Sequence, residues 1–416
     1  MNRTPRIRPV VSCTLLAVTL AAGATACGGS DHPLAEKPYD AADEISSNVS
    51  EGDRKVDPDK PLEVTVDDDG RITDVTAVDA AGRHLAGELD ADGKRWHSTA
   101  PLAAGTRYTV RVGVEDDDGA PGSRTLSFGT TAAKKFLKVA FGPRAGTYGV
   151  GQPITAELSA PVRDRASRAT VERALRVRST PAVTGSWYWV DDKTLHYRPK
   201  EYWPARATIE VTSGLAGIRV TDTLHGSPSK ALKLTTGDRI EAVTDASTHS
   251  MTVKRNGKVI NTIPVTTGKP GFATRNGVKV VLGKEYRVRM RGETIGIAEG
   301  SSDSYDLQVY YATRVTWSGE YVHAAPWSTG SQGYANVSHG CTGMSTGQAE
   351  WFFNTVREGD IVEVVGSQGE TMAPFGNGYG DWNLTWAKWL KGSALQKNTA
   401  PDRSDTIQAA RLRPEV

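Results

Sequence analysis

Short segments in which apolar and polar residues alternate recur along most of this chain, and they constrain the fold more than any other feature. Clear examples are residues 62–66 and 108–114, and Asp- and Gly-rich turn clusters at 67–70 and 116–119 follow them. Alternation with a period of two predicts strands with one buried face, and regularly spaced turns predict sheets that pack as a sandwich. We therefore expect a mainly β fold, with an immunoglobulin-like domain over residues 59–132.

The next region, residues 133–237, continues the strand pattern and is predicted to form a second immunoglobulin-like domain. It contains a group of aromatic residues, among them Trp187, Tyr188, Trp189 and Trp203. Such residues can form a surface on which sugars stack, but in a small sandwich they more often fill the core. We expect them to pack in the core.

The N-terminus, residues 1–27, has the composition of an export signal. Three arginines precede the apolar run 15–22, and small residues lead to Cys27. The apolar run is too short for a comfortable membrane span. The small residues before Cys27 resemble a bacterial lipoprotein processing site, where the cysteine is lipidated; ordinary signal cleavage is the alternative. Residues 28–58 are polar and rich in turn formers, so we expect a flexible linker.

Net charge gives information mainly about partners. The chain has 50 Lys and Arg residues against 48 Asp and Glu residues, and residues 1–27 hold three of the arginines and no acid. The processed protein is therefore close to neutral. This balance argues against nucleic acid as a partner, because nucleic-acid-binding domains are usually strongly basic.

The cysteine count singles out one thiol. Apart from Cys13, inside the export signal, and Cys27, at its end, the chain contains only Cys341. Cys341 therefore has no intramolecular disulfide partner, and an unpaired thiol in an exported protein is a hazard unless it is used. A small buried core residue is the alternative. The polar, glycine-flanked segment 338–344, with a histidine beside the cysteine, favours a chemical role instead.

Residues 238–366 are predicted to form a further β-rich domain that contains this thiol. After the cysteine segment, Ser345 and Gln348 are spaced as in a capping box, which predicts the start of a short helix through Phe352. Residues 361–365 read as a final strand. The remaining part, residues 367–416, is predicted to form a C-terminal subdomain and tail.

The C-terminal tail is rich in tryptophan. Trp382, Trp386 and Trp389 follow one another at helical spacing, which places them on one face of a predicted helix. We expect this face to be buried against the β-rich domain of residues 238–366.

The arrangement of His323 followed by Ser338-His339-Gly340-Cys341 resembles the L,D-transpeptidases, cell-wall cross-linking enzymes with a YkuD-type catalytic domain. The similarity extends to residues 290–305, to Trp327 and to residues 380–383. It is strongest to actinobacterial lipoproteins of this family that carry two immunoglobulin-like domains. The resemblance implies the same three-domain fold.

The resemblance also implies roles for individual residues. Cys341 would be the nucleophile, His323 would take its proton, and His339 would shape the site. Backbone N–H groups of Gly340 and Cys341 would face the oxyanion, and the carbonyl of Ala324 would orient His323. Residues 290–305, called the flap below, would cover the donor groove. The residues expected to bind substrate are Tyr305, Trp327, Ser338, Met290 and Asn336.

The reaction implied is a two-step acyl transfer between peptidoglycan stem peptides. The cysteine would displace the terminal D-amino acid of a tetrapeptide stem, and an amine of a neighbouring stem would resolve the thioester to form a 3-3 cross-link. No metal or organic cofactor is implied, and carbapenem-type β-lactams would acylate the thiol. The expected location is outside the cytoplasm, on a lipid anchor at the outer face of the membrane. Hydrolysis of the acyl-enzyme, as in an L,D-carboxypeptidase, and a non-catalytic wall-binding lipoprotein are the alternatives.

Overall fold

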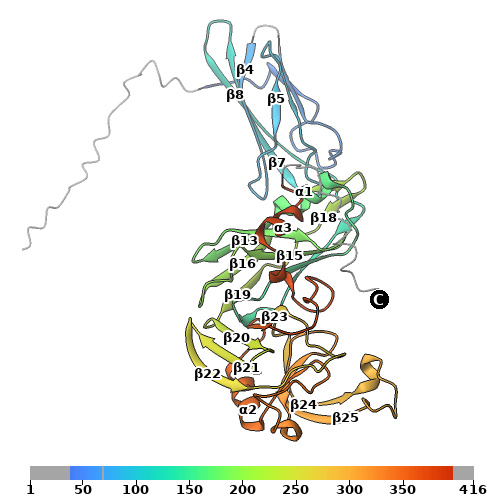
Figure 1. Ribbon diagram of the computed structural model, residues 1–416. Helices are drawn as coiled ribbons and strands as arrows, with labels where there is room; N and C mark the ends of the chain where they lie inside the picture. The colour runs from blue at the N-terminus through green and yellow to red at the C-terminus, as the bar shows by residue number, and fades with distance from the viewer. Residues whose placement is uncertain (1–37, 68–69, 397–416) are drawn as a thin grey trace, which may run out of the picture.

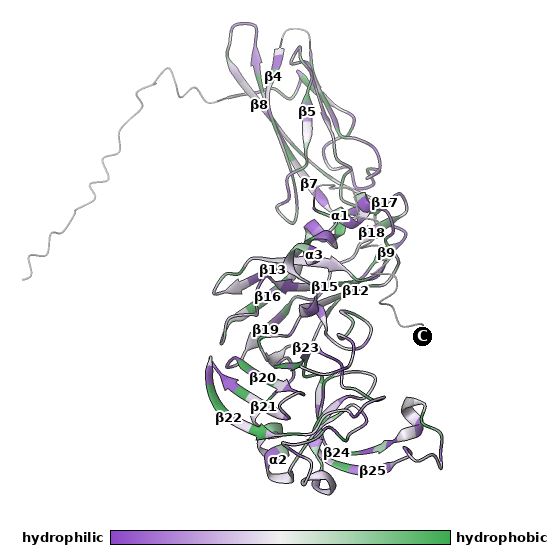
Figure 2. Ribbon diagram, in the orientation of Figure 1, coloured by the Kyte–Doolittle hydropathy of each residue, from purple (hydrophilic) through white to green (hydrophobic). Residues whose placement is uncertain are grey.

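The computed structural model describes residues 38–67 and 70–396, so the predicted export signal, Cys27 and residues 28–37 lie outside the described part. The described chain is mostly β-strand and forms three β units in series along an elongated molecule (Figure 1). Hydrophobic and hydrophilic stretches are interleaved along the strands of all three (Figure 2). None of the helices in the described ranges has the length and hydropathy needed to cross a bilayer.

The N-terminal unit is a sandwich of two four-stranded sheets. One sheet has the order β1 (Tyr39–Asp40), β8 (Pro121–Gly129), β7 (Arg107–Asp116), β4 (Gly70–Asp79). The other has the order β2 (Ile45–Ser47), β3 (Glu63–Val66), β6 (Arg95–Ser98), β5 (Gly87–Leu89). Alternate residues of β7, from Tyr108 to Val114, are buried between the sheets, as the period-two pattern predicts.

The predicted flexible linker is wrong for its described part. Strand β1 pairs in parallel with β8, and β2 pairs antiparallel with β3. Ala41, Ile45 and Val49 are buried in the core of the first sandwich. Residues 39–58 carry few apolar side chains and no periodicity, so their composition resembles a spacer. Their hydrogen-bond partners lie far away in sequence, and composition contains no information about that pairing.

The middle unit contains a second pair of four-stranded sheets and a small third sheet. One sheet of this pair has the order β10 (Val139–Gly142), β12 (Ile154–Leu158), β15 (Thr194–Pro199), β14 (Gly185–Trp189). The other has the order β11 (Gly146–Tyr148), β19 (Leu232–Thr236), β16 (Thr208–Ser213), β13 (Leu175–Thr180). The third is β17 (Arg219–Thr221), β18 (Leu224–Gly226), β9 (Phe136–Leu137). This unit also contains a helix, α1 (Arg165–Ala174). Its N-cap residue is Asp164, whose side chain accepts from the N–H of Ser167.

The aromatic residues of this middle unit fill its core. Trp187, Trp189 and Trp203 are all buried, so the prediction of core packing is confirmed for them. Tyr188 points to the other face of β14, where its ring lies against Trp389 with centroids 5.0 Å apart.

The C-terminal unit carries two sheets joined by one core. The five-stranded sheet has the order β22 (Lys258–Pro264), β21 (Ser250–Arg255), β20 (Ile240–Asp245), β28 (Ile361–Val365), β23 (Gly277–Val280). The four-stranded sheet has the order β24 (Gly283–Arg291), β25 (Asp306–Arg314), β26 (Tyr321–Ala324), β27 (Thr342–Met344). The β24–β25 hairpin projects away from the body (Figure 1), and a 3-10 turn, η1 (Gly292–Ile295), follows β24.

The helix predicted after the cysteine segment is present as α2 (Thr346–Thr355). Ser345 is its N-cap residue, but no side-chain capping hydrogen bond forms. The carbonyl oxygen of the Gln348 side chain instead accepts from Nδ2 of Asn261 at 3.0 Å. Phe352 and Ala349 of α2 are buried in the core of this unit, so packing rather than a capping box holds the helix.

The predicted tryptophan face of the tail is wrong in its partner and in its continuity. A 3-10 turn, η3 (Asp381–Asn383), comes first, and a separate helix, α3 (Trp386–Lys391), begins after the N-cap residue Thr385. Trp389 docks on the middle unit, where Nε1 donates to the carbonyl of Ser186 at 3.0 Å. Trp382 donates to Gly151 of the same unit at 2.8 Å.

The tail nevertheless also contacts the C-terminal unit, so it ties the two units together. Asn383 accepts from the N–H of Val278 at 2.8 Å and donates to the carbonyl of the same residue at 3.0 Å. Arg198 of the middle unit lies over the rings of Trp382 and Trp389, at 4.7 and 4.6 Å. The tail therefore contacts the backbone of the C-terminal unit and the Arg198 side chain of the middle unit.

We expect Trp389→Ala to destabilise this junction strongly. Trp389 is fully buried, and removing a buried tryptophan leaves a cavity that costs about 3–5 kcal/mol in the free energy of unfolding. The measurement is denaturant unfolding monitored by fluorescence. Leu395→Ala is the control, because Leu395 is 45% exposed and its loss should change the free energy by less than about 1 kcal/mol. Equal midpoints for the two variants would contradict the docking role.

Candidate active site

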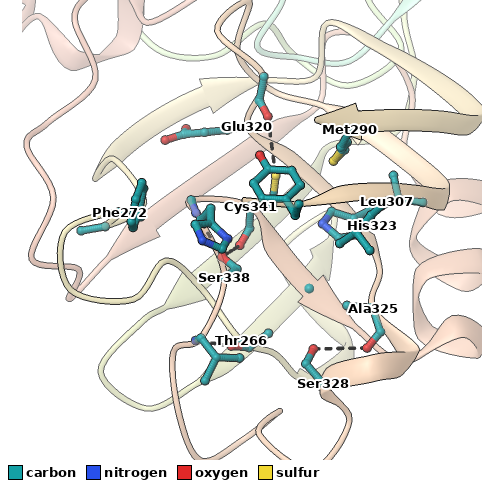
Figure 3. A pocket seen from close by; sticks show the side chains of 18 of the residues that line it. Thr266, Phe272, Met290, Leu307, Glu320, His323, Ala325, Ser328, Ser338 and Cys341 are labelled. Atoms are coloured by element: carbon teal, nitrogen blue, oxygen red, sulfur yellow. Dashed lines mark hydrogen bonds between the residues drawn. The ribbon is translucent and has the colours of Figure 1, made fainter. Parts of the chain in front are cut away.

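A pocket of about 780 Å³ lies where the β24–β25 hairpin, β26 and the loop before β27 meet (Figure 3). Most of the residues predicted for the site line it: Cys341, His323, His339, Gly340, Ser338, Tyr305, Trp327 and Met290. Two predicted residues, Ala324 and Asn336, are not in the lining. The pocket thus brings together predicted residues as far apart in sequence as Met290 and Cys341, because β24 to β27 form one sheet.

The loop that carries Cys341 is braced by its own residues. The hydroxyl of Ser338 donates to the carbonyl of Cys341 at 2.6 Å and accepts from the N–H of Gly340 at 3.1 Å. Gly340 has φ +118°, a backbone conformation that side chains with a Cβ rarely adopt. The chain then enters β27, which pairs in parallel with β26. The sheet therefore places Cys341 next to the strand that carries His323.

The thiol of Cys341 is protonated at neutral pH. Its sulfur donates to the carbonyl of Gly319 at 3.5 Å. Burial of the sulfur raises the pKa of Cys341 to about 12, because the thiolate would lose its hydration there. A neutral thiol of this kind reacts only when a neighbouring base removes its proton.

The imidazole of His323 lines the same pocket. Its ring is only 5% exposed, and its Nδ1 lies 2.8 Å from the carbonyl of Ala324. A carbonyl can only accept, so Nδ1 carries the proton and Nε2 is left as a free acceptor. Burial also lowers the pKa of His323. Figure 3 shows the ring beside Cys341, with a nitrogen turned toward it. The half-exposed ring of Trp327 stacks on the other side of His323, with centroids 6.1 Å apart.

His339 faces the flap. Its ring lies between those of Phe272 and Tyr305, with centroid distances of 4.7 and 5.0 Å. Its Nε2 is 3.6 Å from Oδ1 of Asp303, whose carboxylate also binds Nζ of Lys269 at 2.5 Å. Burial and the Lys269 charge lower the pKa of His339. These contacts link the flap to the loop that carries Lys269 and Phe272.

The flap itself forms one wall of the pocket. Met290 of β24 pairs with Leu307 of β25, and both side chains line the cavity together with Tyr305. These mainly apolar side chains share the pocket with the thiol, the two imidazoles and the hydroxyl of Ser338. An elongated chain with both apolar and amide groups would find matching surfaces in this pocket.

Asn336, predicted to contact substrate, is not among the residues that line the pocket. Its Oδ1 accepts from the N–H of Thr267 at 3.0 Å and lies 3.0 Å from Nδ1 of His249. Its Nδ2 donates to the carbonyl of Ala246 at 2.8 Å. Both ends of the amide are therefore used to anchor the loop on the neighbouring sheet. The spacing of Asn336 from Cys341 gave no indication of this, because its partners are about 70–90 residues away.

The predicted pair of oxyanion donors also needs correction. The N–H of Gly340 is already hydrogen-bonded to Ser338, so it does not point freely into the pocket. The other predicted donor, the N–H of Cys341, is left for that role.

A cluster of charged residues behind the cysteine was not predicted from the sequence. Lys279 is fully buried, and its Nζ lies 2.8 Å from Oε2 of Glu320, which is 6% exposed and lines the pocket. Arg275 binds the other oxygen of Glu320 at 3.1 Å. The only sequence feature that could have indicated a buried charge is the position of Lys279 inside the otherwise apolar run 278–282. A lysine on the exposed face of an ordinary strand would give the same pattern.

Comparisons with known proteins agree with this geometry. Residues 53–219 match the bacterial Ig domain family, and residues 239–364 match the L,D-transpeptidase catalytic domain family. L,D-transpeptidase 2 of Mycobacterium tuberculosis (strain CDC 1551 / Oshkosh) is 33% identical over 399 residues, which cover 94% of this chain and 96% of that protein. L,D-transpeptidase 5 of M. tuberculosis (strain H37Rv) is 31% identical over 420 residues, which cover 98% and 90%.

Solved structures match about half of the chain. The structure of LD transpeptidase LdtMt1 in complex with imipenem is 40% identical, covers 55% of this chain and 99% of that chain, and has a TM-score of 0.48. Both the matched families and the near full-length relatives lead to one assignment. The chain belongs to the L,D-transpeptidase family.

Proposed function

We propose that this protein is a peptidoglycan L,D-transpeptidase that forms 3-3 cross-links through a thioester on Cys341. The observation that carries the proposal is the pairing, in one pocket, of the only thiol of the described chain with a buried imidazole whose Nε2 is free to accept a proton. Family membership supports the reaction class, and the pocket supplies the groups that the reaction needs.

In the first step, Sγ of Cys341 forms a bond to the carbonyl carbon that precedes the terminal D-residue of a tetrapeptide stem. His323 accepts the thiol proton and then donates it to the departing nitrogen, so the C–N bond breaks and a D-amino acid leaves. The N–H of Cys341 faces the oxyanion. In the second step, the amine of a neighbouring stem attacks the thioester and gives its proton to His323. The new amide is the cross-link, and the thiol is restored.

The resting state that supports this proposal is a neutral pair. Burial raises the pKa of Cys341 to about 12 and lowers the pKa of His323, so the thiol keeps its proton until a donor occupies the pocket. Thiolates are the form that oxidants attack, and the protein is expected to act outside the cytoplasm. A protonated thiol at rest thus protects the nucleophile between turnovers.

The donor stem would lie between the flap and the polar groups of the pocket. Tyr305 and Met290 give it apolar contacts, and Trp327, which is 53% exposed, stands at the mouth. One solved relative is described in complex with imipenem. We propose that carbapenems likewise acylate Cys341 of this chain.

Intact-protein mass spectrometry tests the proposal. Incubation with a disaccharide-tetrapeptide should add the mass of the donor minus its terminal D-amino acid, and a cross-linked dimer should appear in solution. Trimmed stems without dimers would instead support an L,D-carboxypeptidase. A chain that gains mass with neither the donor nor a carbapenem would be a non-catalytic wall-binding protein, and the proposal would be wrong.

We further infer that the protein is anchored to the outer face of the membrane by lipid on Cys27, which lies outside the described residues. The basis is the sequence of the export signal and the small residues before Cys27. We expect Cys27→Ala to move the protein from the membrane fraction to the medium or soluble fraction and to abolish labelling by a fatty-acid analogue. Cys13→Ala is the matched control and should change neither. Unchanged fractionation of Cys27→Ala would contradict the anchor.

A further inference from the structure

Three charged side chains lie behind the reacting cysteine and contact one another. Nζ of Lys279 is 2.8 Å from Oε2 of Glu320 and also donates to the carbonyl of Arg275 at 2.6 Å. Oε1 of Glu320 accepts from both the side chain and the backbone N–H of Arg275, each at 3.1 Å. Glu320 stands on the pocket wall near Cys341 (Figure 3).

Stability alone is a weak reason for such a cluster. Lys279 is completely buried, and withdrawing an ammonium group and a carboxylate from water costs several kcal/mol for each ion before their attraction offsets it. Burial accordingly lowers the pKa of Lys279, while the charge of Glu320 opposes that change. Well-packed apolar residues at these positions would stabilise the fold as well or better, so the position of the pair next to the nucleophile calls for a functional reason.

The pair is connected to the sulfur through one turn of backbone. Glu320 stands between Gly319, whose carbonyl accepts from the thiol, and Tyr321, whose N–H is directed at the sulfur. The N–H of Glu320 is held by Oγ1 of Thr316 at 2.8 Å, and its carboxylate is held by the cluster. Fixing Glu320 at both its backbone and its side chain therefore fixes the two backbone groups that contact the thiol.

We propose that the cluster of Lys279, Glu320 and Arg275 positions the turn that holds the Cys341 thiol and sets the charge beside the sulfur, with Lys279 and Glu320 acting in opposite directions on thiolate formation. This inference rests on the proposed role of Cys341 as the nucleophile. Lys279 and Glu320 are positioning residues here, because they act on the thiol through the turn and through their charge.

The sign of each charge effect follows from electrostatics. Burial is the main cause of the raised pKa of Cys341; the carboxylate of Glu320 raises it further and the ammonium of Lys279 lowers it. Outside the cluster, the titratable groups around the thiol are His323, His339, Tyr305 and Tyr321, and Glu370 also lines the pocket. They are the same in every variant described next, so differences among the variants report the cluster.

The experiment measures how fast iodoacetamide alkylates Cys341 in the full chain at a fixed pH between 7 and 9. Below the thiol pKa the thiolate fraction changes tenfold for each unit of pKa, so the alkylation rate reports the pKa directly. We expect Lys279→Met to slow alkylation about tenfold and Glu320→Gln to accelerate it by about the same factor. The double variant should return close to the wild-type rate.

A merely structural role predicts a different pattern. If the cluster only holds the turn and its charges do not act on the sulfur, both single variants loosen the turn and expose the thiol, so both rates rise together. That result, or unchanged rates in both single variants, would overturn the proposal. Thermal unfolding of each variant checks the fold. Should Lys279→Met not fold, Glu320→Gln and the double variant still decide, because the double variant must be the slower of the two.

This test is separable from the proposed function. Alkylation needs no stem peptide, so a chain that fails to form an acyl-enzyme still gives a readable rate. If the alkylation rates of the two single variants change in opposite directions but no acyl transfer occurs, the charge effect is supported and the proposed enzyme activity is contradicted. If acyl transfer occurs but the two rates change in the same direction, the enzyme activity is supported and the charge effect is contradicted.

Discussion

Replacing Cys341 with alanine is expected to abolish the acyl-enzyme and to lower the rate of cross-link formation by about 10⁴-fold or more. The thioester needs the sulfur as its covalent partner, and no other side chain of the pocket lining is a thiol. Two polar side chains of the pocket lining, Ser338 and His339, are held by contacts of their own, with the Cys341 carbonyl and the flap. We therefore expect no substitute nucleophile.

The measurement is intact-protein mass spectrometry with a carbapenem and with the disaccharide-tetrapeptide, alongside a cross-linking assay. Cys27→Ala is the matched control, because it removes a cysteine outside the described domains and should leave the adduct unchanged. An unaltered melting temperature of Cys341→Ala would show that the loss is chemical. A persistent adduct on Cys341→Ala would place the nucleophile elsewhere and refute the mechanism.

Replacing His323 with glutamine is expected to lower kcat/KM for acylation by about 10²–10⁴-fold. Glutamine can still donate to the Ala324 carbonyl, but it cannot accept and return the thiol proton. The adduct should still form slowly, because the sulfur remains. His339→Gln is the control for the loss of an imidazole from the same pocket, and we expect a smaller effect because His339 contacts the flap.

The pH dependence gives an independent check on His323. The base must be neutral, and burial lowers its pKa from the usual 6.5, so it stays competent in mildly acidic solution. Acylation by wild-type protein should decline only as the pH falls through that lowered value, and this acid limb should be absent in His323→Gln. A rate for His323→Gln equal to that of the wild type would assign the base to another residue, with His339 first in line.

Local patterns predicted much of this protein. Segments with period-two alternation are strands in the structure, as β7 shows. The prediction succeeds because the alternation of side chains across a strand depends only on backbone geometry. The single thiol beside a glycine and a histidine indicated the site for a chemical reason that needs no coordinates. Even the helix after the cysteine followed from local residues, although its capping hydrogen bond did not form.

Errors arose wherever the deciding partner was distant in sequence. Residues 39–58 look like a spacer until β1 and β2 pair with β8 and β3. The spacing of Trp389 placed it on a helix face but could not show that Tyr188 of another unit would cover that face.

By itself, the sequence predicted a chain built mainly from β-sheets and singled out Cys341 as the candidate nucleophile, because strand periodicity and the count and neighbours of a thiol can be read directly from the sequence. Only the tertiary structure shows that Asn336 anchors a loop, that the N–H of Gly340 is hydrogen-bonded to Ser338, and that Lys279 forms an ion pair with Glu320. Each of these results depends on where two backbone segments come within hydrogen-bonding distance. The packing of the whole chain sets that distance.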